Sequence, residues 1–218
     1  MQKTPIPYTD LSYQVYERLK EMIISGELKT GEKLKQEHIA AQLGVSRMPL
    51  HKAFQMLEDE LLVENLPRRG FYVRQPTIEE FIEAFECREA LEGMAARKAT
   101  ELMTREKIEE LREIFSRFQS QENINIKDYS KADQYFHESI IKACGNNLLQ
   151  RLNRKGNVLI RTFPKGIVIS IQESLNDHFR ILKALEARNP ALAEKLVKDH
   201  ARKAIDILYM QLNNNKEL

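Results

Sequence analysis

Hydrophobic residues recur at intervals of three and four along the first part of the chain, which is the spacing of one helical face. Over residues 8–28 they predict a helix that ends near Gly26, and over residues 36–57 they predict two shorter helices. The pattern then changes to two short runs of strand-forming residues, 61–64 and 71–74, separated by a turn. We therefore expect three helices followed by a β-hairpin.

The two shorter helices have the spacing of a helix-turn-helix. Ala40 is small enough for the second helix to approach closely, and Gly44 can adopt a turn conformation that a Cβ would penalise. Val45 and Leu50 would anchor the second helix in the core, and Ser46 stands where it could cap that helix. With the hairpin after it, this predicts a winged helix-turn-helix that binds DNA, although the spacing alone also permits an ordinary helical hairpin.

The charges of this region agree with a DNA-binding role. The second helix carries its basic and polar side chains ahead of its first acid, Glu58, and they are Arg47, His51 and Lys52. Such groups at the start of a helix can reach base edges in the major groove. The turn of the hairpin adds Arg68, Arg69 and Gly70, which could enter the minor groove or contact phosphates; a solvated turn is the alternative.

The remainder of the chain is predicted to be wholly helical. Pro76 and a capping-box pattern from Thr77 to Glu80 mark a boundary, so we predict one domain over residues 1–75 and another over 76–218. Apolar residues at helical spacing predict an antiparallel bundle of helices over 78–100, 104–121, 127–144, 146–162, 171–188 and 190–213. The expected fold is therefore mainly α.

Four ionisable side chains of this bundle lie where leucines would be expected. Asp133 and His137 are one turn apart on the apolar face of their helix, and His178 and His200 each share a face with leucine, valine or alanine residues. Burying such groups without partners costs several kcal/mol, so they need hydrogen bonds or a cation. One carboxylate and three imidazoles suit a divalent metal such as zinc, nickel or manganese. The alternative is that each histidine is a satisfied core residue.

Composition excludes some classes of protein but does not identify the function. The 218 residues are 42% hydrophobic and 30% charged, no run approaches the length of a membrane span, and no signal peptide is evident, so we expect a cytoplasmic protein. The net charge is only +2, so nucleic-acid binding must depend on a local basic patch. The absence of tryptophan and the few aromatic residues favour duplex DNA over single strands.

The first part of the chain resembles the amino-terminal domain of the GntR family of bacterial transcription regulators. The resemblance is carried by SGELKTGEKLKQEHIAAQLGVSRMPLHKAFQMLEDELLVENLPRRGFYV, in which GVSRMPLHKAF stands where family members commonly have GVSRTPVREAL. It implies that Arg47 contacts DNA. Met48 and His51 replace a usual threonine and arginine, so the operator is expected to differ from the common family site. The expected DNA-binding residues are Lys35, Ser46, Arg47, Met48, His51, Lys52, Arg68, Arg69 and Gly70.

From about Thr77 onward the chain resembles the FCD effector domain of the FadR subfamily. In metal-binding members one aspartate and three histidines hold a divalent ion, and the matching residues here are Asp133, His137, His178 and His200. The resemblance also implies that Arg88 anchors the carboxylate of an effector. Pairing of Arg88 with an internal acid such as Glu92 is equally compatible with the sequence, and Asn157 and Arg161 are weaker candidates to line the site.

Together these features predict a transcription regulator, most simply a repressor, that binds operator DNA as a homodimer and responds to a small organic acid bound at a divalent metal. The dimer is implied mainly by the family. One alternative is a metalloenzyme with an accessory DNA-binding module, but beyond the ligands the sequence shows no group plainly placed as a general base, so we expect no enzyme activity. Another alternative is a metal that is purely structural or is itself the signal.

Overall fold

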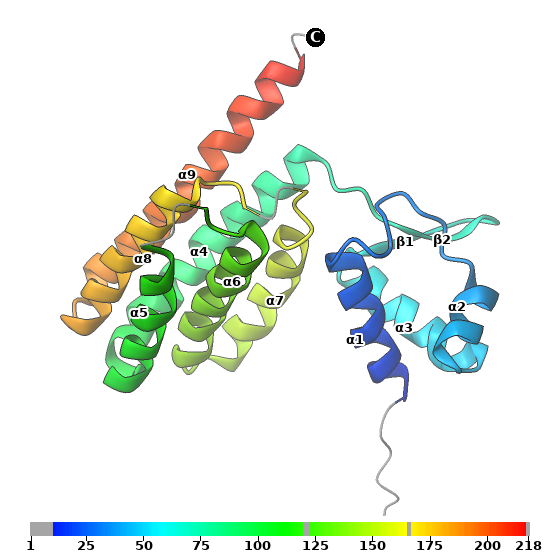
Figure 1. Cartoon of the computed structure of the whole chain (residues 1–218), viewed down its shortest axis with the longest axis horizontal. Helices are drawn as coiled ribbons and strands as arrows, with labels where there is room; N and C mark the ends of the chain where they lie inside the picture. The colour runs from blue at the N-terminus through cyan, green and yellow to red at the C-terminus, as the bar shows by residue number, and fades with distance from the viewer. Residues whose placement is uncertain (1–10, 120–122, 165–166, 217–218) are drawn as a thin grey trace, which may run out of the picture. The chain divides into compact units, whose positions relative to one another are not determined.

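The computed structural model describes residues 11–119, 123–164 and 167–216. The chain divides into two compact units, Met1–Gln75 and Pro76–Leu218, and each is described here by itself. Helices dominate both units, as Figure 1 shows. Residues 8–10, where the first helix was predicted to begin, lie outside the described residues, as do residues 120 and 121 of a predicted helix and residues 165 and 166 of a predicted loop.

The first unit contains three helices and a two-stranded antiparallel sheet. Its elements are α1 (Leu11–Ile24), α2 (Gln36–Leu43), α3 (Arg47–Asp59), β1 (Val63–Leu66) and β2 (Gly70–Val73). Helix α3 packs against α1, α2 and β1, and its apolar face is fully buried through Leu50, Phe54 and Leu57. The described part of this unit is therefore a winged helix-turn-helix, as the pattern predicted.

The turn between α2 and α3 has the conformation that its glycine was expected to supply. Gly44 lies in the left-handed region with φ 65°, and its backbone N–H contacts the carbonyl oxygens of Ala40 and Ala41. Ser46 occupies the N-cap position of α3 with an extended backbone, but its side chain makes no capping hydrogen bond. Ser46 thus occupies the predicted position, but the predicted side-chain cap is wrong: its hydroxyl accepts no hydrogen bond from the first N–H groups of α3.

The strands of the hairpin begin and end at other residues than predicted. The strands were expected at 61–64 and 71–74, whereas β1 starts two residues later and β2 one residue earlier, with Val63 opposite Val73 and Leu66 opposite Gly70. The reason is that Leu61 adopts a left-handed conformation, φ 61°, where the chain leaves α3. The turn residue Arg68 is left-handed as well, with φ 62°, and the wing turn is correspondingly short.

The second unit is a helical bundle, as predicted. Its helices are α4 (Ile78–Leu102), α5 (Arg105–Gln119), α6 (Ile126–Ala143), α7 (Asn147–Ile160), α8 (Ile171–Glu186) and α9 (Pro190–Lys216). The predicted capping box is present at the start of α4, where Thr77 accepts from the Glu80 backbone and Glu80 accepts from that of Thr77. In Figure 1, α4 and α9 run in opposite directions along each other.

Helix α4 organises the bundle because it contacts α6, α7, α8 and α9. The main core includes Phe115 of α5, Tyr129 and Phe136 of α6, and Leu182 of α8, all fully buried. Helices from distant parts of the sequence thus enclose one interior, and polar side chains that point into it must find partners there. Within the described residues, no helix is both long and apolar enough to cross a membrane.

Candidate functional site

One face of α3 is exposed and carries the side chains predicted to contact DNA. Arg47, Met48, His51 and Lys52 are all exposed, while the opposite face packs into the core of the first unit. Met48 is 73% exposed, more than any other large hydrophobic side chain of the described residues. The imidazole of His51 packs edge-on against Phe71 of β2, with ring centroids 5.8 Å apart. This contact connects the exposed face of α3 to the wing.

The guanidinium of Arg47 already has a partner in the absence of DNA. Its Nη2 lies 2.6 Å from Oε1 of Glu37 on α2, and both side chains are largely exposed. An ion pair in such a position contributes about 0–1 kcal/mol, so a phosphate or base can displace the glutamate at little cost.

The wing presents further cations beside an aromatic ring. Arg68 and Arg69 are exposed in the turn, and the guanidinium of Arg69 lies over the ring of Tyr72 at 5.7 Å from its centroid. Lys33 approaches the same ring at 5.9 Å, and Lys35 is exposed just before α2. The predicted DNA-binding residues are therefore accessible, and Arg69 is partly oriented by Tyr72.

The four ionisable residues predicted to share one interior lie together in the second unit. One ligand atom from each of Asp133, His137, His178 and His200 falls within 4.8 Å of the others. The three histidines are buried, whereas the side chain of Asp133 is 20% exposed. The cluster joins α6, α8 and α9, whose residues are far apart in the sequence. Such a set of nitrogen and oxygen donors could hold one divalent ion with bonds of about 2.0–2.2 Å.

Each imidazole of this cluster has a polar neighbour at Nδ1. Nδ1 of His137 lies 2.5 Å from Oε2 of Glu92, and Nδ1 of His200 lies 3.2 Å from Oδ2 of Asp177. Because an ionised carboxylate only accepts hydrogen bonds, both Nδ1 atoms act as donors. The Nδ1 of His178 lies 3.5 Å from the hydroxyl of Tyr129. These contacts leave the Nε2 atoms as the candidate metal ligands.

The Nε2 atoms of two histidines are buried without a hydrogen-bond partner among the described residues. They belong to His137 and His178, and they lie 3.7 Å and 3.4 Å from Oδ1 of Asp133. Ser174 orients that carboxylate, with its hydroxyl 3.4 Å from the same oxygen. Buried polar atoms without partners are rare in folded proteins, and a cation bound between these two rings and Asp133 would satisfy them.

The carboxylates around the cluster are held in the ionised form. Burial opposes the charge on Glu92, but Arg88 and His137 outweigh it and lower the pKa of Glu92 to about 2. Burial likewise opposes the charge on Asp133, but His137, His178 and Arg88 bring its pKa well below the usual range. The pKa of Asp177 is also lowered to about 2, against the effect of burial, by His200 and Lys203. Ionised carboxylates are the form that binds a metal or supports a ligand.

The three imidazoles differ in their affinity for a proton. Burial is the largest influence on His178 and lowers its pKa well below the usual value. Burial also lowers the pKa of His200, although the hydrogen bond to Asp177 opposes it. For His137, burial and Arg88 favour the neutral ring, but the carboxylates of Glu92 and Asp133 outweigh them and raise its pKa. A divalent ion would compete with the proton at each of these rings.

Arg88 pairs with Glu92, the alternative partner that the sequence left open. Its Nε donates to Oε1 of Glu92 at 3.0 Å, four residues along α4. Arg88 nevertheless lines a small cavity of about 40 Å³ beside Asp133 and His200. The rest of this lining is mostly apolar and consists of Phe85, Ile160, Phe163, Ile167, Val168, Ile169, Ser174 and Ala204. Pairing with Glu92 therefore does not remove Arg88 from the candidate effector site.

The two weaker candidates have different positions. Neither Asn157 nor Arg161 is among the described residues that line this cavity. Asn157 instead extends its amide nitrogen to within 3.5 Å of Oε1 of Glu92. The cavity is far smaller than the roughly 300–1,000 Å³ typical of sites for drug-sized ligands, which favours a small molecule.

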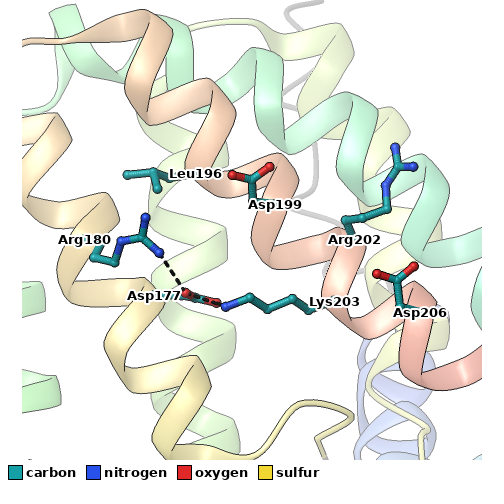
Figure 2. Close-up of a pocket in the computed structure, with 7 residues that line it drawn as sticks. All are labelled: Asp177, Arg180, Leu196, Asp199, Arg202, Lys203 and Asp206. Atoms are coloured by element: carbon teal, nitrogen blue, oxygen red, sulfur yellow. Dashed lines mark hydrogen bonds and ion pairs between the residues drawn. The ribbon is translucent and has the colours of Figure 1, made fainter.

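Asp177 also belongs to a charged surface pocket between α8 and α9. Figure 2 shows its carboxylate meeting the amino group of Lys203, whose Nζ lies 2.8 Å and 2.7 Å from the two oxygens, with Arg180 at 3.7 Å. Lys203 and His200 therefore approach the same carboxylate from α9. The sequence analysis did not predict the contact of Asp177 with His200. The only indication in the sequence is that Asp177 directly precedes His178.

Two family models match the chain. Residues 11–73 match the model described as bacterial regulatory proteins, gntR family, and residues 83–203 match the FCD domain. A relative from Paenarthrobacter nicotinovorans, described as a probable D-xylose utilization operon transcriptional repressor, is 32% identical over 88% of this chain and 86% of its own length. The Nta operon transcriptional regulator of Aminobacter aminovorans is 27% identical over 85% of this chain and 88% of its own length.

Solved structures agree with the fold. The Escherichia coli protein McbR/YncC matches with a TM-score of 0.77 and 24% identity, covering 93% of this chain and 98% of its own. A putative GntR transcriptional regulator from Rhodococcus sp. RHA1 matches with a TM-score of 0.76 and 24% identity, covering 92% and 98%. The relatives compared are described as regulators of transcription rather than as enzymes.

Proposed function

This chain belongs to the GntR family of bacterial transcription regulators and carries an FCD domain, and from this we propose that it represses transcription until a small carboxylate binds beside a metal ion in the FCD domain. Membership implies that the winged helix-turn-helix binds operator DNA. That the chain represses transcription, binds a metal and responds to an effector is our proposal. The expected setting is the cytoplasm, where the operator is accessible.

The observation that carries the metal proposal is the orientation of the buried imidazoles. Glu92 and Asp177 face the Nδ1 atoms of His137 and His200, and the Nε2 atoms of His137 and His178 have no hydrogen-bond partner among the described residues. Metal-binding histidines commonly donate their second ring N–H to a carboxylate in this way. The residues present therefore fit a divalent ion, which zinc, nickel or manganese could supply.

The neighbourhood of Asp133 favours a site that remains open to a ligand. Asp133 is partly exposed and lines the small cavity together with Arg88 and His200. A bound ion would supply a Lewis-acidic position for an oxygen of the effector. Arg88 would pair with the effector's carboxylate through its terminal nitrogens, since a guanidinium matches a carboxylate in a fork. The small, partly apolar cavity supports a short organic acid.

Regulation requires that the effector bind two arrangements of the protein with different affinity. Helices α4, α6, α8 and α9 all contribute side chains around the cluster, so an effector that draws them together would change the packing of the bundle. We propose that the protein acts as a homodimer, in which this change alters how two winged domains engage the two halves of an operator. Such a change would relieve repression.

Elemental analysis of the purified protein tests the metal. We expect about one equivalent of zinc, nickel or manganese per chain, and loss of this metal in the His137→Ala/His200→Ala variant, because two of four ligands are removed. The matched control is His38→Ala, which removes an exposed histidine of the first unit and should keep the metal. Metal absent from the wild type even after reconstitution with each ion would contradict the proposal.

Operator release then tests the effector. A panel of short carboxylates is added to the complex of metal-loaded protein and operator DNA, and fluorescence anisotropy reports release. We expect at least one acid to release DNA from the wild type but not from Arg88→Met, because the anchor is lost. Metal without release by any acid would favour a structural ion, or a metal that is itself the signal.

A further inference from the structure

Glu92 occupies a central position in the FCD domain that its sequence context does not reveal. It lies on α4 and is only 1% exposed. Buried carboxylates require partners, and those of Glu92 come from three helices. They are His137 of α6 at 2.5 Å, Arg88 of α4 at 3.0 Å and Asn157 of α7 at 3.5 Å. All three approach with a nitrogen, so the carboxylate accepts from each of them.

The two oxygens of this carboxylate serve different groups. Oε2 faces Nδ1 of His137, and Oε1 faces Nε of Arg88. Holding Nδ1 directs the Nε2 of the imidazole toward Asp133. Holding Nε of Arg88 leaves the two terminal nitrogens of the guanidinium for another partner. One carboxylate therefore orients both a candidate metal ligand and a candidate effector anchor.

We propose that Glu92 is a positioning residue that aligns His137 for the metal and Arg88 for the effector, and so makes the two sites depend on each other. This inference rests on the proposed function, because it assumes that the cluster binds a metal. It goes further in naming the group that connects metal to effector. The position requires a side chain with two acceptor oxygens, since the nitrogens of Arg88, His137 and Asn157 all donate to it.

The Glu92→Gln variant isolates this property because it nearly preserves the shape of the side chain. Glutamine has one acceptor oxygen, and its NH2 group would face a donor on the other side. If its oxygen accepts from Arg88, its NH2 faces Nδ1 of His137, which must then accept, and the imidazole proton moves to Nε2, the atom that a metal would need. The hydrogen bond to a metal-binding histidine commonly changes metal affinity by about tenfold to a hundredfold.

Asp177 provides a matched comparison on the other side of the cluster. It accepts from His200 and Lys203, and no contact with Arg88 is present among the described residues. Asp177→Asn should therefore weaken metal binding through His200 without involving the effector anchor. The two variants change the same chemical group next to two different histidines.

The experiment measures zinc affinity by competition with a chromophoric chelator. We expect Glu92→Gln and Asp177→Asn each to bind zinc about tenfold to a hundredfold more weakly than the wild type. Adding Arg88→Met to Glu92→Gln should recover much of the loss, because the single oxygen of the glutamine is then free to accept from His137. Adding Arg88→Met to Asp177→Asn should bring no such recovery, because Asp177 does not hold Arg88.

The outcomes separate this inference from the proposed function. A wild type that binds none of zinc, nickel and manganese would overturn the proposed function. Zinc binding in the wild type with unchanged affinity in Glu92→Gln would overturn the positioning role, and failure of Arg88→Met to improve Glu92→Gln would overturn the sharing of the carboxylate. Circular dichroism checks that each variant is folded.

A second measurement needs only the wild-type protein. In the metal-free protein at a pH where His137 is neutral, ¹⁵N NMR should show its proton on Nδ1 and none on Nε2, because Glu92 accepts from Nδ1. A proton on Nε2 instead would overturn the inference even if Glu92→Gln failed to fold.

Discussion

The exposed face of α3 and the polar cluster of the FCD domain hold their charged side chains under opposite conditions. Arg47 meets Glu37 in solvent, where water and ions screen the pair and either partner can leave at little cost. His137 meets Glu92 in an interior where both are almost completely buried. There an unpaired charge costs several kcal/mol, so the groups are tied to one another.

This difference suits DNA binding by the first region and the ligand sensing that we propose for the second. A surface that binds DNA must exchange its partners readily, and loosely paired or free cations do so. A site that senses a small ligand must hold its groups in place before the ligand arrives, which buried hydrogen bonds from several helices accomplish. The comparison predicts that the two regions respond very differently to pH, to point substitution and to salt.

The largest expected effect is the acid sensitivity of the metal-free FCD domain. The pKa of Glu92 falls from 4.5 to about 2 on folding, so this group contributes stability above about pH 4.5 that is lost as the pH falls toward 2. Such a shift corresponds to about 3 kcal/mol. His178 and His200 also have lowered pKa values, so stability already decreases as the pH falls below the unfolded value of 6.5.

His137 works in the opposite direction, because its pKa is raised and its contribution is lost as the pH rises through that value. We expect the other groups to dominate, and denaturant unfolding of the chelator-treated protein at several pH values measures the sum. His178→Phe is the matched variant, since the ring packs between Phe115 and Phe136 at centroid distances of 4.5 Å and 4.3 Å. It should flatten the change near pH 6.5, and an unaltered profile would contradict the role of that imidazole.

Substitution of Arg47 should have the next largest effect. Arg47→Ala is expected to weaken binding to the operator by about 1–3 kcal/mol, because a base contact is lost, with a smaller loss on random DNA. Arg69→Ala, in the wing, should weaken all sequences and lower the salt slope by about 1. Anisotropy titrations on both DNAs at several salt concentrations measure these changes. Equal loss on random DNA for Arg47→Ala would show that Arg47 does not read bases.

The smallest expected effect concerns Met48, which is 73% exposed among basic residues. The thymine methyl is the apolar group in the major groove, so we expect Met48 to contact one. Replacing that thymine by deoxyuridine in a selected operator should weaken binding by about 0.8 kcal/mol, the value of one methyl group. The Met48→Ser variant should be insensitive to the replacement. A wild type that tolerates deoxyuridine at every operator position would exclude this contact.

Much of the fold follows from local patterns, for reasons that particular residues make clear. Gly44 predicted the turn of the helix-turn-helix because few other residues adopt its backbone conformation. Asp133 and His137 were predicted to share a face because their spacing alone determines it. The strand boundaries of the hairpin were not predictable in this way, since the left-handed conformation of Leu61 delays the start of β1, and side-chain patterns do not encode it.

The partners of the cluster were harder to predict because they come from other helices. Helical periodicity shows which side of α4 faces inward, but not that Glu92 lies opposite His137 rather than beside Arg88 alone. The same holds for Asp177, whose carboxylate turns toward α9 although it precedes His178 directly in the sequence. Contacts between helices depend on crossing angles and distances that a single sequence does not specify.

The burial of the cluster has a kinetic consequence. The candidate ligands and their carboxylate partners come from α4, α6, α8 and α9, and the three imidazoles are almost inaccessible to solvent. An ion held at this point would be bonded to three helices at once, so its release would require these bonds to break together and would be favoured by local opening of the bundle. Bound metal would then slow amide hydrogen exchange in all four helices together.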